Sequence, residues 1–206
     1  MFMVKHIIFD LDGTIADTLE QTGQALNRVL KNRGMKLINQ FEVEEFRKLD
    51  TKLIVKRLGV SRRQMAGFVL ELKSEMKKRE STNIFPEAIR VLDVLKDDFV
   101  LSLVTSSPQD LVNQVIESNE LYFDSVYSDV SIFGKSRVLK KILKNSDYST
   151  SELMYVGDET RDIDAAKTAG IQVGVVSWGY NHIDKLASMH PDYVFRDFRD
   201  ILRIND

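Results

Sequence analysis

The chain has 206 residues, enough for one full hydrophobic core and a small second domain, and 43% of them are hydrophobic. Its 29 basic residues nearly balance its 31 acidic ones, which provides no global basic field for nucleic acid, and the absence of cysteine excludes disulfides, thiolate metal sites and cysteine nucleophiles. The amino terminus lacks a signal-peptide pattern and no stretch is long enough to span a bilayer, so we expect a cytoplasmic protein, monomeric or homodimeric, that binds neither nucleic acid nor membrane.

Short apolar runs recur along the chain and predict a parallel sheet. They occupy residues 4–9, 100–104, 153–156, 171–176 and 193–195. Their near-continuous hydrophobicity is typical of strands that helices cover on both faces. In the second half the runs alternate with helical segments: one begins after Pro86, the next has Ser107 as its expected N-cap, and a third ends at Gly170. This alternation predicts a doubly wound α/β fold, with its ligand site at the carboxyl ends of the strands.

Residues 17–83 interrupt this alternation, because their apolar positions keep helical spacing and form no convincing strand. Three local signals support helices there: Asp17 with Glu20 and Ser61 with Gln64 resemble capping boxes, and Gly34 resembles a helix stop. We therefore expect an inserted helical cap of three or four helices over 17–83, and an α/β core domain built from 1–16 and 84–206.

The first candidate site residues follow the strand that ends at Phe9, in the run Asp10-Leu11-Asp12-Gly13-Thr14. A carboxylate at a strand end can attack phosphorus and form an aspartyl-phosphate, which is the role that Asp10 fits. Asp12 points the same way in an extended segment, so it could protonate the leaving oxygen and later activate water. The alternative is an Asp-Gly turn with a helix cap behind it, and five such residues in order after a buried strand disfavour it.

Later strand ends supply the other parts that phosphoryl chemistry requires. Thr105 and Ser106 follow the strand at 100–104, where hydroxyl and backbone N–H groups could bind phosphate, although simple capping would also explain them. Lys135 opens a helix and offers one fixed cation, but alone it could be a surface lysine. Asp158 and Asp162 lie where a strand passes into a helix and provide the oxygen ligands that Mg²⁺ prefers, or else an acidic helix amino terminus.

These four segments, in this order, resemble the motifs of haloacid dehalogenase superfamily phosphatases, and most of all the phosphoglycolate-phosphatase-like branch. The run from Asp10 to Thr14 matches the first motif, Thr105 the second, Lys135 the third, and Asp158 with Asp162 the fourth. The chain departs from the branch at Ser106 and Ser107, where Asn and Lys are frequent, and after Lys135, where a Lys-Pro-x-Pro pattern is frequent.

The resemblance implies a Rossmann-like core with a helical cap inserted after the first motif. It implies that Asp10 is the nucleophile, that Asp12 is the acid and base, and that Thr105 and Lys135 hold the phosphoryl group. Mg²⁺ would be bound by the Asp10 carboxylate, the Asp12 backbone carbonyl and Asp158, with Asp162 helping from nearby. The expected function is Mg²⁺-dependent hydrolysis of a small phosphorylated metabolite, phosphoglycolate-like or a sugar phosphate.

The expected cap carries an uneven charge, because residues 47–63 hold seven basic side chains against the single acid Asp50. Arg47 and Lys48 are the candidates there for substrate contact, and a solvated helix face is the alternative. Three alternatives to a phosphatase stay open: a phosphotransferase or β-phosphoglucomutase-like mutase, a signalling receiver that is phosphorylated on aspartate, and a non-catalytic binding protein with the same fold.

Overall fold

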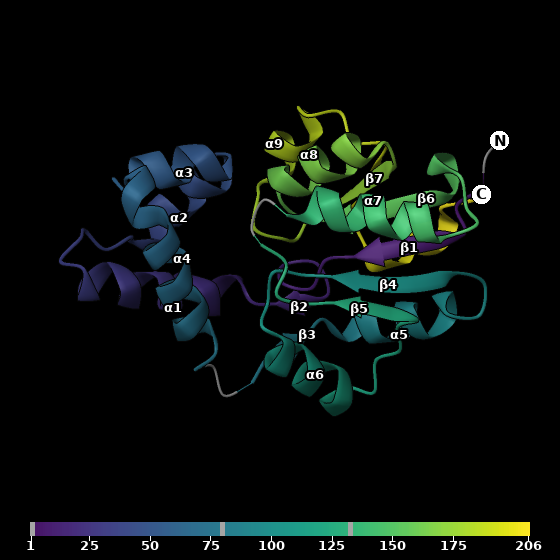
Figure 1. The fold of residues 1–206 in the computed structure, drawn as a ribbon, viewed down its shortest axis with the longest axis horizontal. Helices are drawn as coiled ribbons and strands as arrows, with labels where there is room; N and C mark the ends of the chain where they lie inside the picture. Colours follow the sequence, from purple (N-terminus) through teal and green to yellow (C-terminus); the bar gives the residue numbers. More distant parts are fainter. Residues whose placement is uncertain (1–2, 79–80, 132–133) are drawn as a thin grey trace.

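The computed structural model describes residues 3–78, 81–131 and 134–206 and has an α/β sheet at its centre (Figure 1). Within that part of the chain the sheet has six parallel strands in the order β5-β4-β1-β6-β7-β8. The strands are β1 (His6–Phe9), β4 (Val100–Val104), β5 (Ser125–Tyr127), β6 (Leu153–Gly157), β7 (Gln172–Val176) and β8 (Tyr193–Phe195). The doubly wound α/β prediction is confirmed.

Helices cover both faces of this sheet, which explains the unbroken hydrophobicity of its strands. Alternate residues of a strand point to opposite faces, so Ile7 and Phe9 enter one core cluster and Ile8 enters the other. The helices are α5 (Pro86–Leu95), α6 (Gln109–Ser118), α7 (Lys135–Asn145), α8 (Thr160–Ala169) and α9 (Ile183–Ala187), with short 3₁₀ helices at Thr150–Glu152 and Phe198–Arg203. Gly170 ends α8 in the left-handed conformation at φ 77°, as its sequence position predicts.

Between β1 and α5 the described residues form four helices with a small core of their own. They are α1 (Leu19–Asn32), α2 (Gln40–Arg47), α3 (Thr51–Arg57) and α4 (Arg62–Met76), and we call them the helical unit. Val29, Leu30, Val60 and Phe68 form its cluster of buried apolar residues. Figure 1 shows the helical unit beyond the carboxyl ends of β1 and β4. No helix in the described ranges is both long and apolar enough to cross a membrane.

Two elements at the base of the helical unit escaped prediction because each is only two residues long. β2 (Ala16–Asp17) pairs antiparallel with β3 (Asn83–Ile84) and so joins the entry and exit of the unit. The predicted Asp17–Glu20 capping box is wrong: Asp17 belongs to β2, and Thr18 occupies the N-cap of α1 without a side-chain hydrogen bond. In the second predicted box, the Gln64 side chain accepts the Ser61 backbone N–H at 3.1 Å.

His6 at the start of β1 makes stability depend on pH. Its Nε2 lies 2.8 Å from Ser102 Oγ, and its buried Nδ1 has no hydrogen-bond partner among the residues described. Burial lowers the pKa of His6 to about 4, against the opposing charge of Asp124. The unfolded chain takes up this proton near the ordinary value of 6.5, so the free energy of unfolding should fall as the pH drops from 6.5 toward 4.

We expect His6→Gln, which keeps a polar partner for Ser102, to lose this part of the acid sensitivity. Urea denaturation of both proteins at about pH 7.5 and about pH 5 measures it as the difference between the two pH-dependent changes in unfolding free energy. Equal changes in the two proteins would show that His6 stays protonated or solvated in the folded state.

Candidate active site

The carboxyl ends of three neighbouring strands bring the candidate residues together. β1 pairs in parallel with β4 on one side and with β6 on the other, and the register aligns their ends. Asp10 follows β1, Thr105 follows β4 and Asp158 follows β6. The Asp10 backbone N–H extends the ladder by donating to Val156 O at 2.9 Å, so the turn into the helical unit begins from a fixed position.

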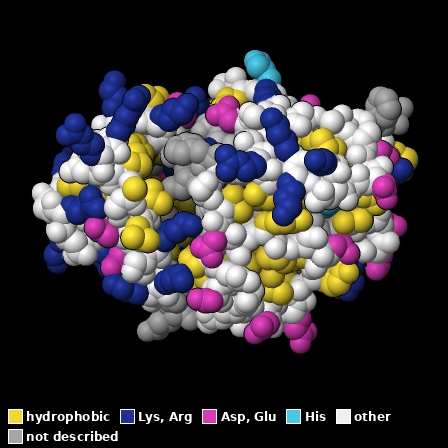
Figure 2. All heavy atoms as spheres, viewed as in Figure 1, with side chains coloured by type: hydrophobic (Ala, Val, Ile, Leu, Met, Phe, Trp, Pro, Cys, Tyr) yellow, Lys and Arg dark blue, Asp and Glu magenta, His cyan; other side chains and the backbone are white. Residues whose placement is uncertain are grey.

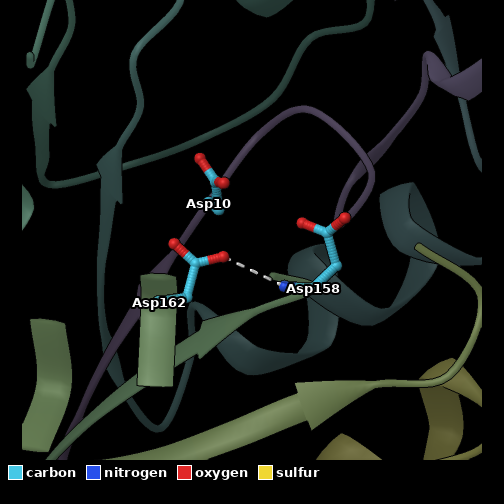
Figure 3. A group of neighbouring side chains, drawn as sticks. All are labelled: Asp10, Asp158 and Asp162. Atoms are coloured by element: carbon cyan, nitrogen blue, oxygen red, sulfur yellow. Dashed lines mark hydrogen bonds between the residues drawn. The ribbon is translucent and has the colours of Figure 1, made fainter. Parts of the chain in front are cut away.

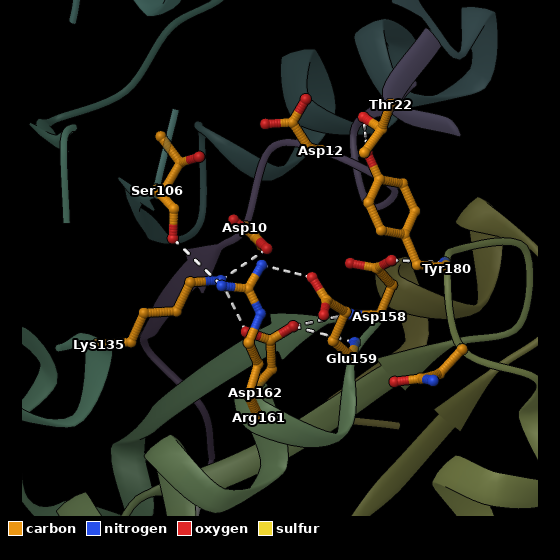
Figure 4. Close-up of polar contacts among 12 residues, drawn as sticks. Asp10, Asp12, Thr22, Ser106, Lys135, Asp158, Glu159, Arg161, Asp162 and Tyr180 are labelled. Atoms are coloured by element: carbon orange, nitrogen blue, oxygen red, sulfur yellow. Dashed lines mark hydrogen bonds and ion pairs between the residues drawn. The ribbon is translucent and has the colours of Figure 1, made fainter. Parts of the chain in front are cut away.

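Lys135, the first residue of α7, links two of these carboxylates. Its Nζ donates to Asp10 Oδ2 at 2.6 Å and to Asp162 Oδ1 at 2.7 Å, as the dashed lines in Figure 4 mark. All three side chains are 3% exposed or less. Buried charges are tolerated only when they are paired and hydrogen-bonded, which this arrangement achieves. The structure therefore rules out the surface-lysine alternative for Lys135.

Burial and charge act against each other on these groups. Burial raises the pKa of Asp10 to about 7, although the Lys135 ammonium opposes that rise. Burial also opposes ionisation of Asp162, but the charges of Lys135 and Arg161 and several hydrogen bonds hold the pKa of Asp162 below its ordinary value. For Lys135, burial acts to lower the pKa, and the charges of Asp10 and Asp162 outweigh it, so the pKa is raised and the ammonium persists.

Asp10, Asp158 and Asp162 form a cluster that could hold a metal ion. One oxygen of each lies within 4.8 Å of the others, and Figure 3 shows the three carboxylates turned toward a common space. Asp158 accepts from Thr14 Oγ1 at 3.0 Å and from the Tyr180 backbone N–H at 2.6 Å. Burial, with the charges of nearby acids, raises the pKa of Asp158 well above its ordinary range, so a cation here would stabilise its ionised form.

Two glycines allow the backbone to approach Asp158 closely. Gly13 has φ 77°, and a Cβ on it would stand 2.2 Å from Asp158 Oδ2. A Cβ on Gly179 would stand 2.1 Å from Asp158 Cβ. Only glycine fits these positions without displacing the carboxylate, so the loops after β1 and β7 together shape the space around Asp158.

Asp12 and Thr105 are joined through Ser107. The Ser107 hydroxyl donates to Asp12 Oδ2, and the Ser107 backbone N–H donates to Thr105 Oγ1 at 3.0 Å. The prediction that Ser107 caps the next helix is wrong, because Pro108 holds the N-cap position of α6. Ser107 instead connects the loop after β4 to the loop after β1, and it leaves the Thr105 O–H able to donate elsewhere.

Ser106 meets a residue that the sequence did not single out, Arg161 on the first turn of α8. Arg161 Nη1 donates to Ser106 Oγ at 3.3 Å, and Nη2 pairs with Glu159. Figure 4 shows this guanidinium beside Asp10 and Lys135. The charge of Arg161 helps to lower the pKa of Asp162 and opposes the rise in the pKa of Asp10, so a second cation belongs to the site.

The two candidates from the helical unit have other partners. Arg47 donates to Gly179 O at 3.0 Å and to Tyr180 O at 3.1 Å, and so joins α2 to the loop after β7. Asn181 completes that contact, because its Nδ2 donates to Arg47 O at 3.0 Å and its Oδ1 accepts the Thr160 backbone N–H at 2.9 Å. Lys48 pairs with Glu45 at 2.9 Å on the surface. The structure gives neither side chain a contact with Asp10, Lys135 or Asp158.

The sequence did not reveal several residues that support the candidate groups through hydrogen bonds and contacts. Tyr155, Arg161, Tyr180 and Asn181 all bond to, or lie beside, the candidate groups. Their only sequence signal is proximity to a strand end, and most polar residues at such places are solvated. Trp178 donates to Thr14 O at 3.0 Å and packs on Phe198.

A parallel α/β sheet with buried aspartates and a buried lysine at its strand ends defines a hydrolase of the haloacid dehalogenase-like type. The chain belongs to this family, since the haloacid dehalogenase-like hydrolase model matches residues 7–176. Among curated relatives, it is 27% identical to a phosphoglycolate phosphatase from Synechococcus elongatus, covering 97% of this chain and 96% of that protein. It is 26% identical to a phosphoglycolate phosphatase from Vibrio cholerae, and the match covers 99% of this chain and 98% of that protein.

Solved structures agree on the fold. A haloacid dehalogenase-like hydrolase from Streptococcus pneumoniae superposes with a TM-score of 0.82 at 22% identity, covering 98% of this chain and 99% of that one. A Bacteroides vulgatus protein assigned as a β-phosphoglucomutase superposes with a TM-score of 0.75 at 18% identity, and the match covers 98% of this chain and 87% of that one. At such identities the likeness concerns the architecture alone.

Replacing the buried lysine should destabilise the protein. We expect Lys135→Met to lower the free energy of unfolding in metal-free buffer by about 3 kcal/mol, because it leaves two buried carboxylates without their cation. In an Asp162→Asn background the same change should cost less, since one of those carboxylates is already neutral. Urea denaturation of the four proteins gives this coupling directly.

The matched control is Lys140→Met, an exposed lysine on the same helix, which should change the unfolding free energy by less than about 0.5 kcal/mol. Additive effects of Lys135→Met and Asp162→Asn would contradict an energetic coupling between the two side chains.

Proposed function

We propose that the protein is a Mg²⁺-dependent phosphatase that hydrolyses a small phosphomonoester through an aspartyl-phosphate on Asp10. The observation that carries this proposal is the convergence of a buried nucleophile candidate, Asp10, with a fixed ammonium on Lys135 and a second buried carboxylate on Asp158. Phosphoryl transfer depends on positioning and on charge stabilisation around the phosphoryl oxygens, which such a set supplies. The names of the curated relatives support the same reaction class and make phosphoglycolate one candidate substrate.

In the proposed reaction the free oxygen of Asp10 attacks phosphorus, because its other oxygen, Oδ2, accepts from Lys135. The bond from phosphorus to the leaving oxygen breaks, and Asp12 transfers its proton to that oxygen. Asp12 then removes a proton from water, which attacks phosphorus, releases inorganic phosphate and restores the Asp10 carboxylate. The Ser107 hydroxyl orients Asp12 for both transfers.

Lys135 and Thr105 are the proposed contacts to the phosphoryl oxygens. The ammonium is already aimed at Asp10, so it would offset the repulsion between the phosphoryl group and this carboxylate. Thr105 accepts from the Ser107 backbone N–H, which leaves its hydroxyl hydrogen for the phosphoryl group. Ser106 is placed beside it with its oxygen held by Arg161.

The metal proposed for the aspartate cluster is Mg²⁺, with Asp10, Asp158 and the backbone carbonyl of Asp12 as ligands and Asp162 nearby. The donor set fits, since carboxylate and carbonyl oxygens are the ligands that Mg²⁺ prefers. Asp162 Oδ2 accepts the backbone N–H groups of Asp158 and Glu159 at 3.2 and 3.0 Å, so Asp162 positions the ligand loop. When bound, Mg²⁺ would neutralise charge on the phosphoryl oxygens.

A phosphotransferase or mutase of the same fold remains the nearest alternative. Incubation with a sugar monophosphate and a bisphosphate activator separates the two functions. The phosphatase proposal requires stoichiometric release of inorganic phosphate, and isomerised sugar without free phosphate would establish the mutase instead.

Both aspartates of the first motif should be required for hydrolysis. We expect Asp10→Asn to reduce the hydrolysis of p-nitrophenyl phosphate at least about 10³-fold, because it removes the nucleophile. Asp12→Asn keeps the shape of the side chain but removes the proton that a carboxylic acid can transfer, so it should lower kcat by about 10²- to 10⁴-fold. Asp17→Asn, an exposed carboxylate in β2, is the matched control with full activity. Equal phosphate release by wild type and Asp10→Asn would overturn the catalytic assignment.

Metal binding should be visible apart from activity. We expect Mg²⁺ to raise the melting temperature of EDTA-treated wild-type protein in a concentration-dependent way, since a ligand of the folded state stabilises it by mass action. Asp158→Asn should abolish the shift, whereas Asn in place of the exposed Asp147 should retain it. A Mg²⁺-induced shift that survives Asp158→Asn would place the metal elsewhere.

A further inference from the structure

Arg161, on the first turn of α8, is a largely buried cation that has no chemical role in the proposed reaction. Its side chain is 18% exposed, and its Nε is buried with no hydrogen-bond partner among the residues described. A buried donor without a partner costs free energy, and such donors are rare in folded proteins. The unused donor therefore indicates that a further group binds to this guanidinium.

Two loops hold the guanidinium across the candidate site. Its Nη2 pairs with Glu159, in the loop after β6, and its Nη1 donates to Ser106 Oγ at 3.3 Å, in the loop after β4. In the sheet β1 lies between β4 and β6, so a group that joins their loops passes over the carboxyl end of β1, where Asp10 lies. Figure 4 shows the guanidinium there, beside Asp10 and Lys135.

Small molecules can reach this guanidinium from solvent through a cavity of about 340 Å³. Arg161 and Lys135 both line the cavity. Figure 2 shows the surface hollowed between the helical unit and the α/β core, with Lys and Arg side chains on both sides of the hollow. A group that enters the site therefore meets two fixed cations.

The phosphoryl group of the proposed reaction requires more donors than Lys135 has left. An ammonium has three N–H bonds, and Asp10 and Asp162 each accept one from Lys135. The Thr105 hydroxyl supplies one further donor in the proposed reaction. During transfer the negative charge spreads over the three equatorial oxygens of the phosphoryl group, so another fixed cation beside Asp10 would stabilise it.

We propose that Arg161 is a catalytic residue, which donates a hydrogen bond to the phosphoryl group as it moves to and from Asp10. The inference rests on the proposed phosphatase function and adds a second cation to its machinery. The guanidinium has five N–H donors and uses only some of them on Glu159 and Ser106. It keeps its protons in both steps, so the bonds that form and break are unchanged. Because both partners fix its plane, the remaining donors need no reorganisation.

Removal of the charge tests this role in the full chain with Mg²⁺. We expect Arg161→Gln, which keeps an amide donor for Ser106, to lower kcat for p-nitrophenyl phosphate by about 10²-fold or more, as the loss of one donor to developing charge typically does. The leaving group of this substrate carries no second anion, so the loss reports on the phosphoryl group itself. Arg137→Gln, an exposed arginine on α7, is the matched control and should keep the wild-type kcat.

Chemical rescue separates direct contact from a structural role. Arg161→Ala leaves an empty space beside the cavity, so guanidinium chloride at concentrations far below denaturing ones should restore its activity several-fold and in a saturable way. Urea has the same shape without the charge and should restore nothing. Neither compound should raise the activity of Arg137→Ala. Urea denaturation checks that each variant is folded, and Arg161→Lys, which retains a cation and should outperform Arg161→Gln, replaces any variant that is not.

The possible failures separate this inference from the function on which it rests. Wild-type hydrolysis that depends on Asp10 but persists at full kcat in Arg161→Gln would reject the role of Arg161 and leave the phosphatase intact. A loss of activity that guanidinium does not restore, or that urea restores equally, would assign Arg161 to the structure of the site and overturn the direct contact. If the wild-type protein fails to hydrolyse any phosphomonoester, the phosphatase proposal and this inference fall together.

Discussion

The ammonium of Lys135 between Asp10 and Asp162 is the contact on which the rest of the site depends. It joins the end of β1, the start of α7 and the first turn of α8, three elements far apart in the chain. Without that cation, the interior would hold like charges that repel and lack water. Desolvation of all three groups costs free energy, so the arrangement fixes geometry more than it stabilises the fold. A side chain held in this way meets a reacting phosphoryl group without further reorganisation.

A second set of contacts ties the helical unit to the same loops. The segment after β7 bonds Asp158 through Tyr180, accepts the Arg47 guanidinium at two carbonyls, and meets the start of α8 through Asn181. Movement of α2 away from this segment would therefore change the surroundings of Asp158. The position of the helical unit and the shape of the acidic cluster are thus coupled through a few hydrogen bonds.

The sequence predicted the long buried strands of the core, and it missed the short strands and the contacts between loops that are distant in the chain. The long strands and the acidic turns after β1 and β6 were predictable, because a continuous apolar run that ends in carboxylates is typical of a buried parallel strand leading into a site. The β2–β3 pair has two residues in each strand, too few for a hydrophobic period, and the edge strand β5 contains no buried residue. Ser107 illustrates another limit: a serine before a helix usually caps it, and only the fold brings Asp12 within reach.

The candidate substrate-binding residues of the helical unit show the same limit. Arg47 and Lys48 stood out as part of a basic run, yet their partners are carbonyls of the core and a neighbouring glutamate. Arg161 lies in an acidic segment and has no sequence signal of its own, although it lies beside Asp10. Charge along a helix is visible in a sequence, whereas the direction in which a side chain points across a domain boundary is not.

The proposed role of Asp10 as phosphoryl acceptor can be tested by rapid acid quenching during turnover of a phosphomonoester, followed by mass spectrometry of the peptide that contains Asp10. We expect a phosphoryl group on Asp10 that forms within the first turnover and decays at the rate of steady-state hydrolysis. Turnover at the full rate with no phosphoryl group on Asp10, or with one on another residue, would contradict it.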